Sequence, residues 1–198
     1  MKQLYIVILC FSLGTSLAIS QESESIKPLR IGVKIGTPSI ATVNLEYVTP
    51  LLNNRVGVTV DYLPLNINAD DISLQIRNLE VGATIYLNDT GKGLYASLSY
   101  FNFNTSADVT EVEFDDFTVG DGSTSLEFGT FNVKLGVKLG GTFYSRFELG
   151  YAFGDLPNEL IIESTDGTQT TTEAIEDIPV LGASGFPIFN LGFGISFL

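Results

Sequence analysis

Apolar and polar residues alternate one by one along most of the chain, and this period of two is the feature that most restricts its fold. Between Phe131 and Leu139, every second residue is apolar, whereas the residues between them are Asn, Lys or Gly. Successive side chains of a β-strand point to opposite faces, so such a segment predicts a strand with one apolar face. Beyond Gln21, no stretch has the apolar spacing of an amphipathic helix or the length of a helical membrane span. The sequence therefore predicts an all-β protein.

Eight segments share this alternation. They cover residues 29–37, 40–48, 55–62, 77–87, 94–101, 131–139, 143–153 and 189–197. Strands of about ten residues suit a tilted membrane-crossing strand, and eight is the smallest strand number of bacterial outer-membrane barrels. We therefore predict an eight-stranded antiparallel up-and-down transmembrane β-barrel over residues 29–198. The parity of the apolar residues reverses at Leu74 and Ile76, which predicts either a bulge near Arg77 or a strand that leaves the apolar layer there.

The predicted connections alternate in length. Short turns follow the second, fourth and sixth segments at residues 49–54, 88–92 and 140–141. Long loops follow the third, fifth and seventh segments at residues 64–72, 104–124 and 154–187, and only the first loop, 37–39, breaks this rule. This asymmetry is typical of a barrel with both termini on the periplasmic side. In the last loop, residues 160–162 and 178–181 flank Asp166-Gly167, which predicts an extended hairpin with this pair at its tip.

The N-terminus has the features of a secretory signal peptide. Lys2 precedes the apolar run Leu4 to Leu17, and Ala18 and Ser20 are small residues where a signal peptidase cleaves. The polar run 21–25 ends the apolar stretch before the roughly 20 residues that a membrane anchor needs. We therefore expect a signal peptide over residues 1–20, a short segment over 21–28, and a barrel domain over 29–198.

Composition excludes most catalytic and nucleic-acid functions. The chain has no His, and its one Cys lies in the expected signal peptide, so catalysis by a His base or a Cys-His pair is excluded. Imidazole and thiolate metal sites are excluded for the same reason. The 10 Lys and Arg residues stand against 23 Asp and Glu residues, which argues against binding to nucleic-acid phosphates. We expect no enzyme activity, no cofactor and no nucleic-acid partner.

The polar faces of the segments carry glycines and charged residues, whereas the apolar faces carry no charge. Glycine makes room in a narrow eight-stranded lumen, so we expect the polar faces to point inward. Carboxylates beside several Lys and Arg side chains are expected to be ion-pair partners rather than catalytic acids. We predict a lumen charge network that plugs the barrel, and the alternative is a solute path or gate. The predicted network contains Arg30, Lys34, Glu46, Arg55, Asp61, Glu80, Lys134, Lys138, Arg146 and Glu148.

Six carboxylates gather in the predicted third loop, where they could contact Ca²⁺ or bridge divalent ions to lipopolysaccharide phosphates. They are Asp108, Glu111, Glu113, Asp115, Asp116 and Asp121. The loop lacks the spaced order of a dedicated calcium loop. We therefore favour a solvated acidic loop and predict no metal site.

The chain closes on Phe193-Gly194-Ile195-Ser196-Phe197-Leu198. With this ending and its alternating segments, it resembles small outer-membrane β-barrel proteins of Gram-negative bacteria, of the OmpA/OmpX/OmpW type, and the outer-membrane barrel-domain proteins of Bacteroidetes. The resemblance implies the cell outer membrane as location, and lipid, lipopolysaccharide and the barrel-assembly machinery as partners. It implies an assembly signal at Phe193, Ile195, Phe197 and Leu198, although family members usually end in an aromatic residue and this chain ends in Leu198.

Barrels of this kind serve many functions, so the resemblance defines the architecture better than the activity. We expect a monomeric, non-enzymatic, structural or surface-interaction protein with acidic extracellular loops. One alternative is a narrow channel, or an OmpW-like conduit for small apolar molecules. A second is a soluble periplasmic barrel that holds a ligand inside. The sequence leaves the identity of any extracellular ligand open.

Overall fold

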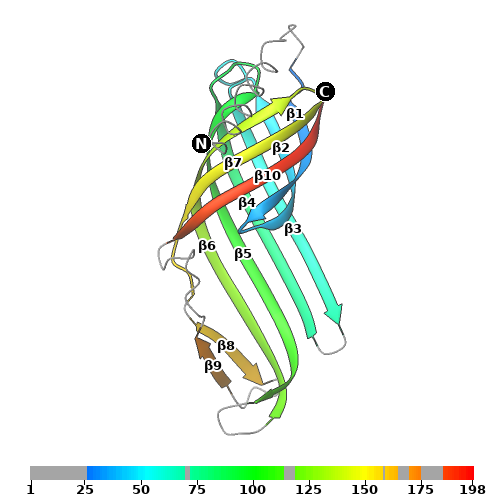
Figure 1. The fold of residues 1–198 in the computed structure, drawn as a ribbon, viewed down its shortest axis with the longest axis vertical. Helices are drawn as coiled ribbons and strands as arrows, with labels where there is room; N and C mark the ends of the chain where they lie inside the picture. Colours follow the sequence, from blue (N-terminus) through cyan, green and yellow to red (C-terminus); the bar gives the residue numbers. More distant parts are fainter. Residues whose placement is uncertain (1–25, 70–71, 114–118, 158, 165–169, 175–184) are drawn as a thin grey trace, which may run out of the picture.

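The computed structural model describes residues 26–69, 72–113, 119–157, 159–164, 170–174 and 185–198. Ten strands form one antiparallel sheet, and eight of them close into a barrel (Figure 1). The barrel strands are β1 (Leu29–Thr37), β2 (Ile40–Thr49), β3 (Val56–Ala69), β4 (Ile72–Tyr86), β5 (Gly93–Glu113), β6 (Val119–Gly140), β7 (Phe143–Phe153) and β10 (Gly185–Phe197). The other two are β8 (Glu159–Ser164) and β9 (Thr170–Ala174). Within the described ranges, no helix is long and apolar enough to cross a membrane.

Each barrel strand pairs with the barrel strands before and after it, β7 pairing with β10 across the segment that contains β8 and β9, and the pairing of β1 with β10 closes the ring. The predicted eight-stranded antiparallel up-and-down barrel is therefore confirmed. The Cα partners Leu29 and Phe197 bring the first and last strands together at one end of the barrel. The short connections 50–55, 87–92 and 141–142 lie at this same end, close to where they were predicted.

The long loops predicted at residues 64–72 and 104–124 are wrong, because most of these residues continue the strands. Strands β3 and β4 stay paired as far as Ala69 and Ile72, and β5 and β6 stay paired as far as Glu113 and Val119. The two hairpins extend far beyond the other barrel strands, in the lower half of Figure 1. The register of β3 and β4 is unbroken, so the bulge predicted near Arg77 is also wrong. The alternative prediction, a strand that leaves the apolar layer, describes β4.

The two faces of the extended hairpins exchange polarity. Beyond the barrel, the face that continues from the buried Asp61 and Glu80 becomes apolar, and the opposite face becomes polar. The inner face carries Leu65, Leu74, Ile76, Phe101, Phe103, Leu126 and Phe128, and the outer face carries Asn66, Gln75, Asn102, Asn104 and Glu127. Three of the inner rings pack together, with centroid distances of 5.0 Å between Phe103 and Phe128 and 6.4 Å between Phe101 and Phe103. A search of the sequence for one continuous apolar face therefore ends each of these segments at the point where the two faces exchange polarity.

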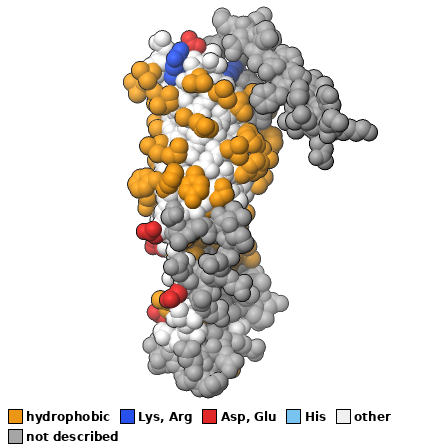
Figure 2. All heavy atoms as spheres, turned by 60° about the vertical axis from the view of Figure 1, so that its left-hand side comes forward, with side chains coloured by type: hydrophobic (Ala, Val, Ile, Leu, Met, Phe, Trp, Pro, Cys, Tyr) orange, Lys and Arg blue, Asp and Glu red, His pale blue; other side chains and the backbone are white. Residues whose placement is uncertain are grey.

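The barrel itself is apolar outside and polar inside. Leu135 and Phe193 are 67% and 58% exposed, whereas the neighbouring Lys134 is 3% exposed. Figure 2 shows the apolar side chains as a belt around the barrel wall, with carboxylates beyond its lower border. Within the described strands, no outward-facing side chain of this belt is charged. One border of the belt is aromatic, because Phe131 pairs with Tyr100 on one side and with Phe153 on the other.

The last predicted loop contains the expected hairpin. Leu160, Ile161 and Ile162 of β8 pair with residues 171–173 of β9, which confirms a hairpin but makes β9, and not residues 178–181, the partner of this apolar segment. Strand β8 also pairs with β6 at Gly122–Thr124. The tip Asp166-Gly167 and residues 178–181 lie outside the described residues, as does the predicted signal peptide 1–20, which stays a prediction.

Candidate functional site

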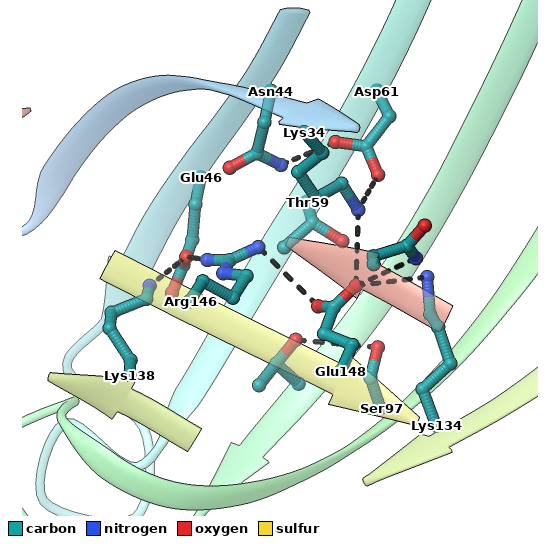
Figure 3. A network of polar contacts seen from close by, with 12 residues as sticks. Lys34, Asn44, Glu46, Thr59, Asp61, Ser97, Lys134, Lys138, Arg146 and Glu148 are labelled. Atoms are coloured by element: carbon teal, nitrogen blue, oxygen red, sulfur yellow. Dashed lines mark hydrogen bonds and ion pairs between the residues drawn. The ribbon is translucent and has the colours of Figure 1, made fainter. Parts of the chain in front are cut away.

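The candidate site is a set of nine buried charged side chains inside the barrel. Each lies on the inward parity of its strand, opposite an apolar outward residue. They come from β1 (Arg30, Lys34), β2 (Glu46), β3 (Asp61), β4 (Glu80), β6 (Lys134, Lys138) and β7 (Arg146, Glu148). A spacing of four residues on β1 and β6 separates the charges into two levels along the barrel axis. All nine belong to the network predicted from sequence, and Figure 3 shows seven of them.

The first level is the Glu46 cluster, formed by Glu46, Arg30, Lys138 and Arg146. Arg30 Nη1 donates to Glu46 Oε1 at 3.0 Å, while Lys138 Nζ and Arg146 Nη2 both donate to Glu46 Oε2. The hydroxyl of Tyr86 donates to Glu46 Oε1 at 2.5 Å. One carboxylate therefore receives three cations and a hydroxyl, all from different strands.

The second level is the central network, formed by Lys34, Asp61, Glu80, Lys134 and Glu148. Lys34 Nζ pairs with Asp61 and lies 3.6 Å from Glu148 Oε2. Lys134 Nζ lies 2.6 Å from Glu80 Oε1 and 4.0 Å from Glu148 Oε2. Each ammonium therefore contacts two carboxylates.

Arg146 joins the two levels, as Figure 3 shows. Its Nη1 lies 3.7 Å from Glu148 Oε1, and its Nη2 binds Glu46. Because every interior carboxylate contacts at least one cation, the arrangement suits ion pairing across the barrel rather than proton transfer.

Amides and hydroxyls complete the coordination of the carboxylates. Their donors are Asn44 to Asp61, Asn132 and Ser99 to Glu80, and Asn190 and Tyr95 to Glu148. These partners were not singled out from sequence. Their inward parity is the signal that could have found them, since each is the polar member of an alternating segment.

Comparison with known proteins gives a likeness of fold only. The barrel is similar to two solved structures of Acinetobacter baumannii. The crystal structure of CarO2 has a TM-score of 0.45 and 12% identity, covering 88% of this chain and 100% of that chain. The crystal structure of CarO has a TM-score of 0.45 and 13% identity, covering 86% of this chain and 98% of that chain. No family model and no curated protein matches the chain.

Arg55 is the one predicted network residue that does not join it, so its assignment was wrong. Its side chain is exposed in the turn between β2 and β3, because β3 begins one residue later, at Val56. Arg55 instead contributes its carbonyl oxygen, which accepts a hydrogen bond of 2.7 Å from the Tyr86 backbone.

The predicted acidic cluster is only partly described. Asp108 and Asp121 are exposed on β5 and β6 rather than in a loop. Glu111 and Glu113 belong to β5 by their backbone, and Asp115 and Asp116 lie outside the described residues. Among the side chains that the structure describes, no group of three or more Asp, Glu, His or Cys residues could hold a metal ion. Of the predicted assembly signal, Phe193, Ile195, Phe197 and Leu198 are all exposed on the outside of the barrel end.

Inward tyrosines lie against strand glycines and fill the space that those glycines leave. A Cβ added to Gly194 would lie 2.5 Å from the Tyr144 ring and 2.4 Å from the Ile31 carbonyl oxygen. Tyr144 in turn lies near two cations, with Lys138 Nζ 4.9 Å from the ring centroid. The glycine therefore sets the position of a ring that packs on the Glu46 cluster.

We predict that Gly194→Ala destabilises the barrel by about 1–3 kcal/mol, because the added methyl group forces the Tyr144 ring and the β1 backbone to shift. The measurement is urea unfolding of the protein refolded in detergent. Gly192→Ala is the matched control on the same strand, since its added Cβ would have no neighbour closer than 3.1 Å. Equal losses of stability in the two variants would contradict this packing.

Proposed function

We propose that the protein is a monomeric, non-enzymatic β-barrel of the bacterial outer membrane, with a structural or surface-interaction role. The observation that carries the proposal is the uncharged apolar belt around a closed barrel whose interior holds nine buried charges. A closed barrel satisfies its backbone hydrogen bonds internally, which is the condition for strands to cross a bilayer. Lipid around the belt would cover side chains that are exposed in the isolated chain.

A soluble barrel is disfavoured by the same belt. Soluble monomers rarely expose a continuous apolar patch larger than a few hundred square ångströms. Here the exposed apolar side chains come from all eight barrel strands, including Val33, Leu45, Val81 and Phe193. A soluble periplasmic barrel would place such residues in its core and the Lys and Arg side chains outside.

The lumen is proposed to be plugged. An eight-stranded barrel has an interior about wide enough for its own side chains. Ion pairs run from β1 to β3 through Lys34 and Asp61, from β6 to β4 through Lys134 and Glu80, and from β7 to β2 through Arg146 and Glu46. These pairs connect strands that are not neighbours in the sheet, so they cross the path that a solute would take.

The extended hairpins are proposed to face the extracellular side. They lie at the end opposite both termini, and their outer faces are polar from Asn66 on β3 to Glu127 on β6. A polar face outside the belt suits contact with water, lipopolysaccharide headgroups or another surface molecule. At the other end, the exposed Phe193, Ile195 and Phe197 of β10 are proposed as the signal for the barrel-assembly machinery.

Cell fractionation tests the location. The protein is expected in the outer-membrane fraction, extracted only with detergent, and to migrate differently on a gel before and after boiling. Release of the folded protein without detergent would contradict the membrane proposal and favour the soluble ligand-binding barrel.

Conductance in planar bilayers tests the plug. We predict no steady current from the inserted wild-type protein, because the ion pairs of both levels cross the lumen. A bilayer with an added open porin is the positive control. A steady current from the wild type would favour the narrow-channel alternative.

A further inference from the structure

The interior holds one more positive than negative charge, and the positive excess lies in the Glu46 cluster. The described interior contains five cations and four carboxylates. The central network has two cations and three carboxylates, whereas the Glu46 cluster has three cations and one carboxylate. Removing an unpaired charge from water costs several kcal/mol, so the Glu46 cluster needs a further negative group.

Hydrogen bonding shows the same shortage at the same place. Arg30 Nε and Arg146 Nε are buried and have no partner within the described part of the chain. The hydroxyl groups of Tyr144 and Thr90 are also unpartnered there. Thr90 precedes Gly91, whose carbonyl oxygen accepts a hydrogen bond of 2.7 Å from Arg30. An arginine Nε can only donate, so the two Nε atoms require acceptors, and none contacts them within the described part of the chain.

Three tyrosine rings surround the cations but leave the imbalance in place. Lys138 Nζ lies 5.2 Å from the Tyr86 ring centroid and 4.9 Å from that of Tyr144, and the Arg146 guanidinium lies 5.7 Å from that of Tyr95. Cation–π contacts stabilise such groups by an attraction to the ring quadrupole. The rings are uncharged, so they do not neutralise the cluster.

We propose that the Glu46 cluster binds one small monovalent inorganic anion, of the halide class, between Arg30, Lys138 and Arg146. Figure 3 shows Lys138 and Arg146 both reaching the Glu46 carboxylate. The charge of the anion follows from the interior excess of one positive charge. Its small size follows from the narrow interior of an eight-stranded barrel, which side chains already occupy. The bound anion would be a fixed part of the plug rather than a transported solute.

The test uses the full chain refolded in detergent, with chloride as the probe. Thermal unfolding is followed by the gel shift on heating, in sodium chloride and in sodium gluconate at equal ionic strength. The wild type is expected to unfold several degrees higher in chloride, because an anion bound only to the folded state stabilises it. The folded protein should also broaden the chloride-35 NMR line, and added bromide should reverse this broadening by displacing the bound chloride.

Two variants with the same change in charge locate the site. Lys138→Met keeps the length of the side chain and leaves four cations against four carboxylates, so the chloride dependence and the line broadening should be lost. Arg55→Met removes a cation from the exposed turn and should retain both. If Lys138→Met does not fold, anomalous diffraction from wild-type crystals grown in bromide provides the second test, with a peak expected beside Arg30 and Arg146.

Equal wild-type unfolding in chloride and gluconate would overturn the anion site, as would chloride dependence that persists in Lys138→Met or is lost in Arg55→Met. Absence of a bromide peak at the cluster would also overturn it. None of these results bears on the membrane location, which fractionation tests separately.

Discussion

Glu46→Gln is expected to lower the free energy of unfolding by about 3–5 kcal/mol, the cost of leaving buried charges without their partner. Glu46 is fully buried and, among the residues that the structure describes, is the one carboxylate that Arg30 and Lys138 contact. The amide keeps the shape of the side chain but removes its negative charge. The three cations of the cluster would then repel one another in a region without bulk water.

Urea unfolding in detergent measures this effect. Because the chain has no Trp, unfolding is followed by tyrosine fluorescence or circular dichroism. Glu127→Gln is the matched control, because Glu127 is exposed on the outer face of β6 and its one described hydrogen bond is a 3.3 Å contact from Asn102. The control should change stability by no more than about 0.5 kcal/mol. Similar losses in the two variants would show that Glu46 does not organise the interior.

Leu135→Arg is the second substitution for which we expect a large effect, here on folding into lipid vesicles. Leu135 is 67% exposed and lies in the middle of the outward apolar residues of β6, between Phe131 and Leu139. An arginine on the lipid face near the bilayer midplane costs about 2–4 kcal/mol in a transmembrane barrel. We therefore expect less folded protein in lipid vesicles, measured as a smaller fraction of the faster-migrating form on an unheated gel.

Asn104→Arg is the control for this substitution. Asn104 is exposed on the outer face of β5, in the extended hairpin, and its Cα partner on β6 is Glu127. The new arginine would lie in water between Glu127 and Arg77, which is its Cα partner on β4, so folding in vesicles should change little. If Leu135→Arg folds as well as Asn104→Arg, the belt does not face lipid.

The architecture could be predicted from sequence because the same two-residue period identifies a strand and assigns each of its side chains to the inner or the outer face. Alternation in β6, with Lys134 and Lys138 between apolar residues, predicts both the strand and the side on which each charge lies. The same parity places Glu46 and Glu148 inside the barrel. Arg55 fits the parity of its segment but lies one residue before β3, so periodicity alone cannot exclude it.

The extended hairpins could not be predicted in the same way. Residues such as Asn66, Asn104 and Ser106 are common in turns, and their polarity removes the apolar face that defines the barrel segments. Cross-strand hydrogen bonds hold them in strands all the same. Strands β3 and β4 keep one register throughout, and β5 and β6 keep theirs as far as Val109, with a register shift before Val112. Only in β4 did the reversed parity of Leu74 and Ile76 indicate a strand that continues beyond the apolar layer.

The contacts within the lumen were also beyond prediction. Parity shows that Glu46 and Arg146 both point inward, but their meeting depends on the tilt and stagger of strands on opposite walls. The positions of Tyr86, Tyr95 and Tyr144 depend in addition on the space above particular glycines. These are properties of the closed barrel and not of any one strand.

In the proposed outer-membrane barrel, the exchange of faces along β3 to β6 would fix how deeply the protein sits in the bilayer. Sinking the barrel further would carry Asn66, Gln75 and Asn102 into hydrocarbon, and raising it would lift Leu79 and Tyr100 into water. Both displacements would cost free energy, so the switch in polarity would mark the position of the membrane–water interface on these strands. Any surface function of the hairpins would then operate at a constant height above the headgroups.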